Sequence, residues 1–297
     1  MSEIRIDALL PQEMATRAEY LGVRKAEMPF LKMFMLSVLA GAFISLGAIF
    51  ATTVSAGSMA ITTASGDAAF STGLPFGVTR LLAGLVFSLG LILVVVGGAE
   101  LFTGNNLIVM AWASGKVSGR ALLRNWVIVY FGNFVGAIAT AILMFFTRQY
   151  TFGANSVGIA ALKTGVAKSD LTFLQAVALG ILCNALVCMA VWLTFSARST
   201  MDKIVAIIFP ITAFVAAGFE HSIANMYFIP YALFIKMFDP KFISSVADKV
   251  PHLEKLTWRA FWFANLLPVT LGNIIGGAVL VAAVYWAIFL RPEKTVE

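Results

Sequence analysis

Apolar and polar residues alternate along this chain in long blocks. Six apolar blocks are each long enough to cross a bilayer, which takes about 20 residues in a helix. They span residues 33–54, 81–112, 121–146, 171–196, 203–238 and 258–290. The second and fifth blocks are long enough to contain an interruption, which we place at residues 100–106 and 218–225. The pattern therefore predicts six membrane crossings, with the second and fifth broken inside the membrane.

A short pattern occurs twice, once at each predicted interruption. At an offset of 120 residues, Gly98, Glu100, Gly104 and Asn105 recur as Gly218, Glu220, Ala224 and Asn225. At an offset of 140 residues, Asn125, Gly132, Asn133 and Gly136 recur as Asn265, Gly272, Asn273 and Gly276. Matching interruptions in two related halves are typical of transporters, whose solute path lies between the halves. The sequence therefore predicts a pore or carrier.

The composition agrees with a membrane protein. Hydrophobic residues make up 60% of the chain and charged residues only 12%, whereas soluble proteins carry roughly a quarter charged residues. Six crossings place both termini on one side, and that side carries twelve of the 21 Lys and Arg residues, which predicts that it is the cytoplasm. Topology and contact with the lipid bilayer account for the net charge of +6, so we expect no nucleic-acid partner.

The chain ends are expected to lie outside the membrane domain. Residues 1–29 carry several charges and no early apolar core, so we do not expect a cleaved signal sequence. Helical spacing is shown by Leu9, Leu10, Met14, Ala18 and Leu21. It predicts an amphipathic helix on the cytoplasmic face, for which a regulatory lid is one interpretation. We expect residues 30–290 to form one transmembrane channel domain, with repeats near 30–148 and 170–290, and residues 291–297 to form a cytoplasmic tail.

His221 is the only histidine within a predicted crossing. Ionisable groups are costly in lipid, at roughly 2.5–3.5 kcal/mol for full charges, so its ring is expected to face a cavity. An imidazole with an unperturbed pKa of about 6.5 changes charge near neutral pH. Two interpretations stay open. The ring lies on the solute path, which its place at a helix break favours, or it only bonds a neighbouring helix.

Glu100 and Glu220 occupy equivalent positions in the two halves. A carboxylate at the start of a broken half-helix can accept hydrogen bonds from backbone amides that the break leaves unpaired. We favour this bracing role, shared by Asn105 and Asn225, over a proton relay or a cation site.

The half-helices that resume near Thr103 and Ser222 are expected to direct their amino termini toward the membrane centre. The partial positive charge there favours an anion, and Thr103 and His221 would supply hydrogen bonds. Apolar bulk around them would come from Phe87, Leu91, Leu101, Phe102 and Phe214, although residues of this kind usually serve packing. Three further amides, Asn133, Asn184 and Asn273, either bond neighbouring helices or line the path.

These residues closely resemble the formate/nitrite transporter family over nearly the whole chain. The likeness rests on Phe87-Ser-Leu-Gly-Leu-Ile-Leu, Glu100-Leu-Phe-Thr103 and Gly218-Phe-Glu-His221-Ser-Ile-Ala-Asn225. The formate-channel branch in particular is resembled by Ser199-Thr-Met-Asp-Lys203 and Gly272-Asn-Ile-Ile-Gly-Gly277. The resemblance implies an all-α membrane protein with an aquaporin-like inverted repeat, assembled as a homopentamer with one path per protomer in a bacterial cytoplasmic (inner) membrane.

The resemblance also implies roles for individual residues. Leu91 and Phe214, with Phe87 nearby, would form the cytoplasmic constriction, and Leu101, Phe102 and Val187 the periplasmic one. Thr103 and His221 would lie between the two constrictions, Asn184 and Asn273 would line the route, and Lys168 would be a vestibule lysine that attracts anions. The implied solute is a small monovalent anion, above all formate. As a hypothesis, His221 donates a proton so that neutral acid passes the apolar ring.

Two segments depart from the formate-channel pattern. Gly104-Asn105-Asn106 is more similar to the nitrite and hydrosulfide branches, so these anions stay open as alternatives. The first external loop, residues 57–79, is longer than the formate-channel pattern implies. It contains Ala60-Ile-Thr-Thr-Ala-Ser-Gly-Asp67, for which the sequence suggests no function.

Other classes of protein fit the sequence poorly. An enzyme needs clustered ligands or a nucleophile with a nearby base, and one intramembrane histidine supplies neither. A neutral-solute channel of aquaporin type is expected to carry paired Asn-Pro-Ala turns, and none occurs. The only cysteines, Cys183 and Cys188, point away from each other on a helix. We therefore expect no disulfide, no metal site and no cofactor.

Overall fold

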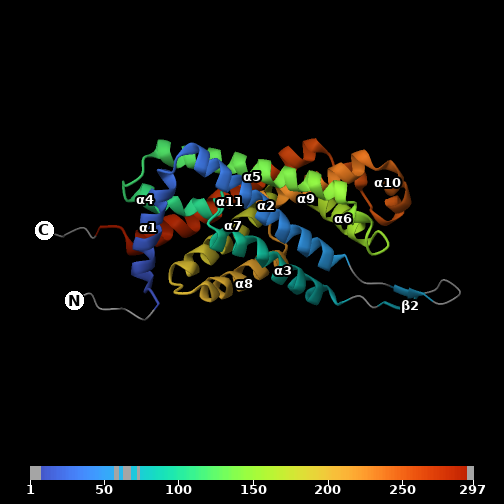
Figure 1. Ribbon diagram of the computed structural model, residues 1–297, viewed down its shortest axis with the longest axis horizontal. Helices are drawn as coiled ribbons and strands as arrows, with labels where there is room; N and C mark the ends of the chain where they lie inside the picture. Colours follow the sequence, from blue (N-terminus) through green and yellow to red (C-terminus); the bar gives the residue numbers. More distant parts are fainter. Residues whose placement is uncertain (1–7, 57–59, 63–67, 72–73, 293–297) are drawn as a thin grey trace.

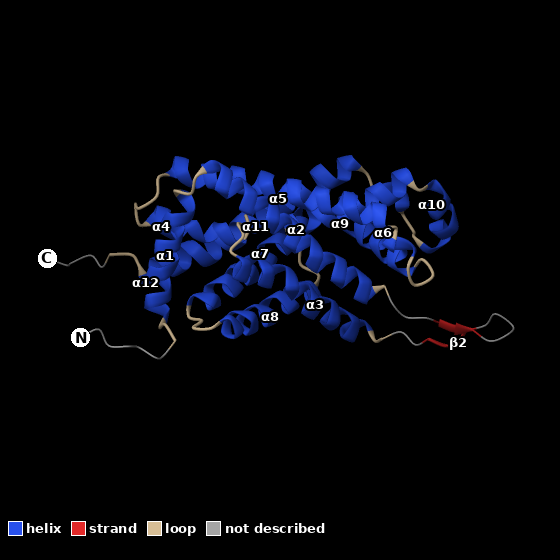
Figure 2. Ribbon diagram, viewed as in Figure 1, coloured by secondary structure: helices blue, strands red, loops and turns tan. Residues whose placement is uncertain are grey.

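The computed structural model describes residues 8–56, 60–62, 68–71 and 74–292, and Figures 1 and 2 show an elongated bundle of helices. In this part of the chain, six helical segments are long and apolar enough to cross a membrane. They are α2 (Phe30–Ser55), α3 (Phe76–Gly97), α5 (Gly119–Thr147), α7 (Phe173–Phe195), α8 (Thr200–Ala217) and the continuous segment Ala260–Phe289. The last segment consists of η5 (Ala260–Leu266), α11 (Leu267–Ile274), η6 (Ile275–Ala283) and α12 (Val284–Phe289). The predicted six crossings are confirmed.

Shorter elements complete the bundle. The α-helices among them are α1 (Pro11–Ala26), α4 (Val109–Ala113), α6 (Ser156–Ser169), α9 (Ser222–Phe238) and α10 (Pro240–Val246). Short 3₁₀ helices are η1 (Gly104–Ile108), η2 (Gln149–Thr151), η3 (Ala247–Lys249) and η4 (Leu253–Lys255). One antiparallel pair of strands, β1 (Ala60–Thr62) and β2 (Ala68–Ser71), lies within the predicted first external loop, much of which falls outside the described residues.

Glycines in a left-handed backbone conformation end α3 and α8. Gly98 has a φ angle of 76° and Gly218 one of 79°, values that glycine adopts without steric cost. In each half the chain leaves the helix at this glycine, and a short helix resumes at Gly104 or Ser222. The predicted interruptions of the second and fifth segments are therefore confirmed.

Small residues bring the crossing helices into close contact. A Cβ atom placed on Gly136 of α5 would lie 2.0 Å from the carbonyl oxygen of Val38 in α2. A Cβ atom on Gly276 of η6 would lie 2.1 Å from the carbonyl oxygen of Ile181 in α7. Close backbone approach of this kind supplies the van der Waals contact that holds helices together in lipid. The contact is the same in both halves.

Both ends of the described chain lie at one end of the bundle, where α1 packs beside α12 (Figures 1 and 2). The side chain of Gln12 donates from Nε2 to the carbonyl oxygen of Phe289 over 2.6 Å. α1 belongs to the packed bundle, because Met14, Ala15 and Ala18 are buried on it. α6 and α10 lie toward the opposite end of the long axis. α6 was not predicted from the apolar pattern of the sequence.

Candidate functional site

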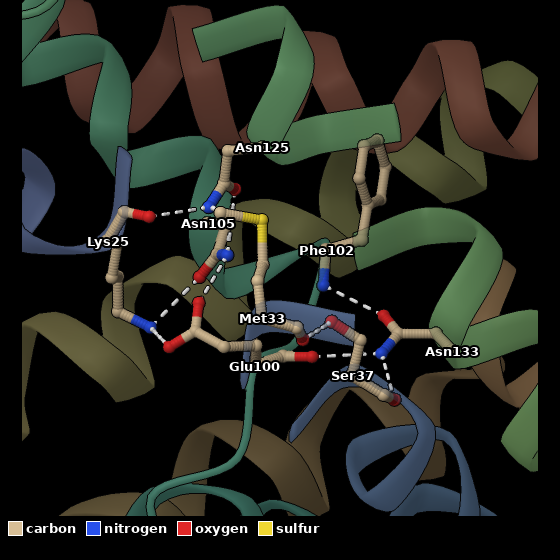
Figure 3. A network of polar contacts seen from close by, with 8 residues as sticks. All are labelled: Lys25, Met33, Ser37, Glu100, Phe102, Asn105, Asn125 and Asn133. Carbon is tan, nitrogen blue, oxygen red and sulfur yellow. Dashed lines mark hydrogen bonds and ion pairs between the residues drawn. The ribbon is translucent and has the colours of Figure 1, made fainter. Parts of the chain in front are cut away.

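Four side chains form a closed polar network at the first helix break (Figure 3). Lys25 Nζ of α1 donates to Glu100 Oε1 over 2.7 Å, and Asn105 Nδ2 donates to Glu100 Oε2 over 2.7 Å. Asn105 Nδ2 also donates to Asn125 Oδ1 over 3.0 Å, and Asn125 Nδ2 donates to the carbonyl oxygen of Lys25 over 3.0 Å. The network ties α1, the break and α5 together.

Asn133 of α5 holds the backbone of the same break. Its Oδ1 accepts the amide N–H of Phe102 over 2.9 Å. Its Nδ2 donates to the carbonyl oxygens of Ser37 and Glu100 over 2.7 and 2.9 Å (Figure 3). Backbone groups that no longer bond within a helix thus find partners, which the apolar surroundings require.

The second break has the same network in equivalent residues. Lys168 Nζ of α6 donates to Glu220 Oε1 over 2.7 Å, and Asn225 Nδ2 donates to Glu220 Oε2 over 2.6 Å. Asn225 Nδ2 also donates to Asn265 Oδ1 over 2.7 Å, and Asn265 Nδ2 donates to the carbonyl oxygen of Lys168 over 2.9 Å. Because Lys168 takes the place of Lys25, the duplication reaches into α1 and α6, ahead of residues 30 and 170.

Asn273 is the counterpart of Asn133. Its Oδ1 accepts the amide N–H of Ser222 over 2.9 Å. Its Nδ2 donates to the carbonyl oxygens of Gly180 and Glu220, each over 2.9 Å. Both hydrogen-bonding atoms of this amide are therefore occupied by backbone groups.

His221 and Thr103 meet where the two breaks approach each other. His221 is the N-cap of α9, and its Nδ1 accepts the amide N–H of Ala224 over 3.1 Å. This acceptor role places the proton of the neutral ring on Nε2. Nε2 lies 3.0 Å from Thr103 Oγ1 and is therefore the donor in this contact. Both residues are buried, and the ring of Phe214 stacks on the imidazole with centroids 5.9 Å apart.

Two cavities approach this contact from opposite ends of the bundle. The α1-side cavity, of about 550 Å³, is lined by residues that include Lys25, Leu91 and Leu101. The α6-side cavity, of about 310 Å³, is lined by residues that include Phe87, Lys168, Phe214 and His221. Neither set of lining residues includes the buried side chains of Phe102, Thr103 and Val187.

Phe87, Phe214 and Leu101 do not lie on the sides expected for them, whereas Leu91 lines the α1-side cavity, as expected. Phe87 and Phe214 were expected on the side of the termini, but they line the cavity remote from α1. Leu101 was expected on the opposite side, but it lines the cavity beside α1. The reason is the direction of α3, which begins at the end remote from the termini and runs toward α1 (Figure 1). Phe87 therefore precedes Leu91 on the way to the α1-side cavity.

Asn184 of α7 is buried beside the backbone carbonyl group of Thr103. Its Nδ2 donates to the carbonyl oxygen of Asn273 over 2.7 Å and to Asn106 Oδ1 over 3.1 Å. This amide group is thus directed at protein atoms, and a role in lining the route stays a prediction for Asn184 and for Asn273.

Two cations near the breaks were missed as site residues. Lys25 was expected only to contribute to the charge that sets the topology, although it pairs with Glu100. Arg80 of α3 lines the α6-side cavity, and its guanidinium donates to the carbonyl oxygens of Val215 and Ala216 over 2.6 and 2.9 Å. It thereby satisfies carbonyl groups at the end of α8. Lys25 could have been identified from the sequence only as the counterpart of Lys168, which follows it by 143 residues.

No group of His, Cys, Asp and Glu side chains suited to a metal ion occurs among the described residues. Cys183 and Cys188 are both free and buried.

Comparison with known proteins identifies the family. The family model described as "Formate/nitrite transporter" matches residues 12–287. "Formate channel FocA" of Escherichia coli (strain K12) is 46% identical over 286 residues, covering 96% of each chain. "Formate channel FocA" of Haemophilus influenzae is 40% identical over 276 residues, covering 92% of each chain. A solved structure described as "Pentameric formate channel with formate bound" is similar with a TM-score of 0.78 at 46% identity, covering 88% of this chain and 98% of that chain. The chain belongs to the formate/nitrite transporter family.

Proposed function

We propose that the chain is a formate channel of a bacterial cytoplasmic membrane, assembled as a homopentamer with one path per protomer and with both termini in the cytoplasm. Its relatives described as formate channels support this proposal. The structural observation that carries it is the contact of 3.0 Å between Thr103 Oγ1 and His221 Nε2. This contact lies between two cavities, at the amino-terminal ends of two half-helices.

The electrostatics of the cavities favour an anion. Basic side chains outnumber acidic ones among the lining residues of both cavities. Lys168 Nζ uses one of its three hydrogens on Glu220, which leaves donors for a solute. The amino termini of η1 and α9 add partial positive charge at the centre. An anion is therefore drawn toward Thr103 and His221 from either side.

The apolar side chains between the cavities set the energetic barrier. Leu91 and Leu101 border one side, and Phe87 and Phe214 border the other, with their rings 5.7 Å apart. A bare formate ion would lose hydration there that few polar groups replace. Formic acid is neutral and crosses the same surface at a much lower cost. Transport is then fastest where the anion can gain a proton.

His221 is the proton donor in this scheme. The ring first takes a second proton on Nδ1, which requires that the contact with the Ala224 N–H opens. Formate then accepts the Nε2 proton, leaving a neutral ring and neutral formic acid. After the acid has passed the apolar side chains, it releases its proton to water in the cavity beyond and leaves as formate. The ring is then neutral again, so each cycle takes up one proton and one formate on one side and releases both on the other.

Nitrite or hydrosulfide is the second candidate solute. The segment Gly104-Asn105-Asn106 supports it, because its sequence is more similar to those branches of the family. Both are also small monovalent anions, so the same cavities and the same donors would serve them.

Flux measurements in proteoliposomes test the proposal. Uptake of formate, nitrite, hydrosulfide and glycerol is compared over a pH series, with and without an imposed proton gradient. We expect formate flux to exceed glycerol flux and to rise as the outer solution is acidified. Glycerol flux above that of every acid would instead indicate a neutral-solute channel of aquaporin type.

The His221→Phe variant tests the proton donor. We expect formate flux at neutral pH to fall about 100-fold, the lower range for loss of a general acid, and its pH dependence to flatten. His252→Asn is the matched control, because His252 is exposed on a loop and faces neither cavity. Unchanged flux and unchanged pH dependence in His221→Phe would contradict the role of this ring.

A further inference from the structure

A chain of three amides connects the two helix breaks. Asn106 Nδ2 donates to the carbonyl oxygen of Phe102 over 3.0 Å, and Asn106 Oδ1 accepts from Asn184 Nδ2 over 3.1 Å. Asn184 Nδ2 also donates to the carbonyl oxygen of Asn273 over 2.7 Å. The side chain of Asn273 in turn holds Ser222 and Glu220 at the second break. The first break is thereby fixed to the second through Asn106, Asn184 and Asn273, which we call the amide bridge.

The amide bridge also encloses the backbone of Thr103. The carbonyl oxygen of Thr103 accepts from Cys188 Sγ over 3.3 Å and lies 3.4 Å from Asn184 Nδ2. Thr103 itself is 0% exposed. Gly277 leaves the space for this arrangement, because a Cβ atom there would lie 2.3 Å from Asn184 Nδ2. The position of Thr103 is therefore set by Cys188 and Asn184 at its carbonyl oxygen as well as by its contact with His221.

The amide bridge has no counterpart in the other half. By the offsets that relate the two polar networks, Asn106 corresponds to Met226, Asn184 to Gly41 and Gly277 to Ala137. The second break is held by the network that both breaks share, together with the contacts of Arg80 and the His221 cap. What the bridge adds is a connection from the first break to the second, which sets their relative placement.

We propose that Asn106 is a positioning residue, which acts through the amide bridge to hold Thr103 Oγ1 within hydrogen-bond distance of His221 Nε2. Thr103 belongs to the first break and His221 to the second, so their separation depends on how the breaks are placed relative to each other. Asn106 fixes this placement from a buried position that lines neither cavity, so it does not contact the solute. This inference rests on the proposed function of the Thr103–His221 pair.

The test is Asn106→Met, alone and combined with Thr103→Val. Methionine occupies the equivalent position in α9, so it is compatible with the start of a half-helix. We expect Asn106→Met alone to slow formate flux about fivefold, the factor that corresponds to one hydrogen bond of about 1 kcal/mol. In the Thr103→Val background, where the hydroxyl is already missing, Asn106→Met should change flux and pH profile no further. Thr103→Val alone serves as the reference for the pair.

Ser45→Ala is the matched control. Ser45 corresponds to Cys188 in the other half, is buried, and its hydroxyl donates only to the carbonyl oxygen of Gly41 in its own helix. It should leave flux unchanged. An Asn106→Met effect that persists in full in the Thr103→Val background would overturn the proposal, as would an unchanged flux or a protein that no longer assembles. Wild-type flux separates the two hypotheses, since a wild-type protein that carries no formate contradicts the proposed function, and the series then continues with nitrite or hydrosulfide.

Discussion

The two helix breaks are held by the same kinds of side chain, but the hydrogen-bonding groups of these side chains have more partners at the first break than at the second. At the first break, Lys25 Nζ donates to Glu100 Oε1 and also to Asn105 Oδ1, over 2.7 and 3.0 Å. At the second break, Lys168 Nζ donates to Glu220 Oε1, while Asn225 Oδ1 is buried without a hydrogen-bond partner among the described residues. The lysine side chains also differ in exposure, at 32% for Lys25 and 15% for Lys168.

A second difference lies in the residue that follows the carboxylate of each break. Leu101 and His221 are related by the offset of 120 residues, so one half places an apolar side chain where the other places an imidazole. Contacts that occur in both halves keep the chain broken and its backbone paired. The imidazole of His221 occurs in one half only, and the proposed function assigns the proton transfer to it.

Removing the carboxylates is expected to have the largest effect on stability. Glu220→Ala would leave Lys168, Asn225 and Asn265 without their shared acceptor, and loss of one partner of a buried ion pair costs about 3–5 kcal/mol. Glu100→Ala should cost less, because the more exposed Lys25 can be hydrated and keeps Asn105. Thermal unfolding of the assembled protein in detergent measures both.

The exposed Glu254 provides the control for these variants, since Glu254→Ala removes a carboxylate with 73% side-chain exposure. It should leave the unfolding temperature unchanged. A Glu100→Ala protein less stable than Glu220→Ala would contradict the idea that the second network is the more tightly enclosed.

Added methyl groups at the helix contacts should affect the halves equally. Gly136→Ala and Gly276→Ala would place a Cβ atom 2.0 and 2.1 Å from a backbone oxygen, so the helices must separate. Overpacking of this kind costs about 1–3 kcal/mol. Unfolding temperatures lowered by similar amounts would show that packing belongs to the shared scaffold. Gly77→Ala, which meets no atom within 4 Å, should behave like the wild type.

The crossings and the helix breaks, which both halves share, were largely predictable from the sequence, because each follows from residues that lie close together along the chain. The length of the apolar blocks gives the crossings, and the recurrence of Glu100 and Asn105 as Glu220 and Asn225 marks the breaks. α6 was missed because Lys163 and Lys168 interrupt its apolar pattern. The partner of Lys25 could not be inferred, since Glu100 lies 75 residues further along the chain. The side of each constriction depends on the direction of α3, which no single residue encodes.

The two left-handed glycines offer a smaller and unequal perturbation. A side chain in this conformation costs about 1–2 kcal/mol, which applies to Gly98→Ala and Gly218→Ala alike. At Gly218 the new Cβ atom would also lie 2.9 Å from a guanidinium nitrogen of Arg80, which caps α8. Gly218→Ala should therefore lower the unfolding temperature more than Gly98→Ala. Gly98→Asn should restore part of the loss, because asparagine tolerates this conformation, and equal losses at both sites would show that Arg80 simply moves aside.

The smallest expected effect distinguishes the helix caps that follow the two half-helices. After α4, Ser118 Oγ accepts the amide N–H of Ala121 over 3.1 Å, and after α9, Asp239 Oδ1 accepts that of Phe242 over 3.0 Å. Ser118→Ala and Asp239→Ala should each cost about 1 kcal/mol at neutral pH.

Only the second of these losses should depend on pH. The Phe242 N–H, the Tyr150 hydroxyl and the Arg148 guanidinium lower the pKa of Asp239 below its ordinary value. A carboxyl whose pKa is lower in the folded protein stabilises it fully above the unfolded pKa of about 3.9, and this contribution disappears as the pH falls through the folded value. The stability difference between wild type and Asp239→Ala should therefore shrink on strong acidification, while that for Ser118→Ala stays constant. Unfolding curves recorded over an acid pH series make the comparison, and a constant difference for Asp239→Ala would mean that its carboxylate charge contributes nothing to this cap.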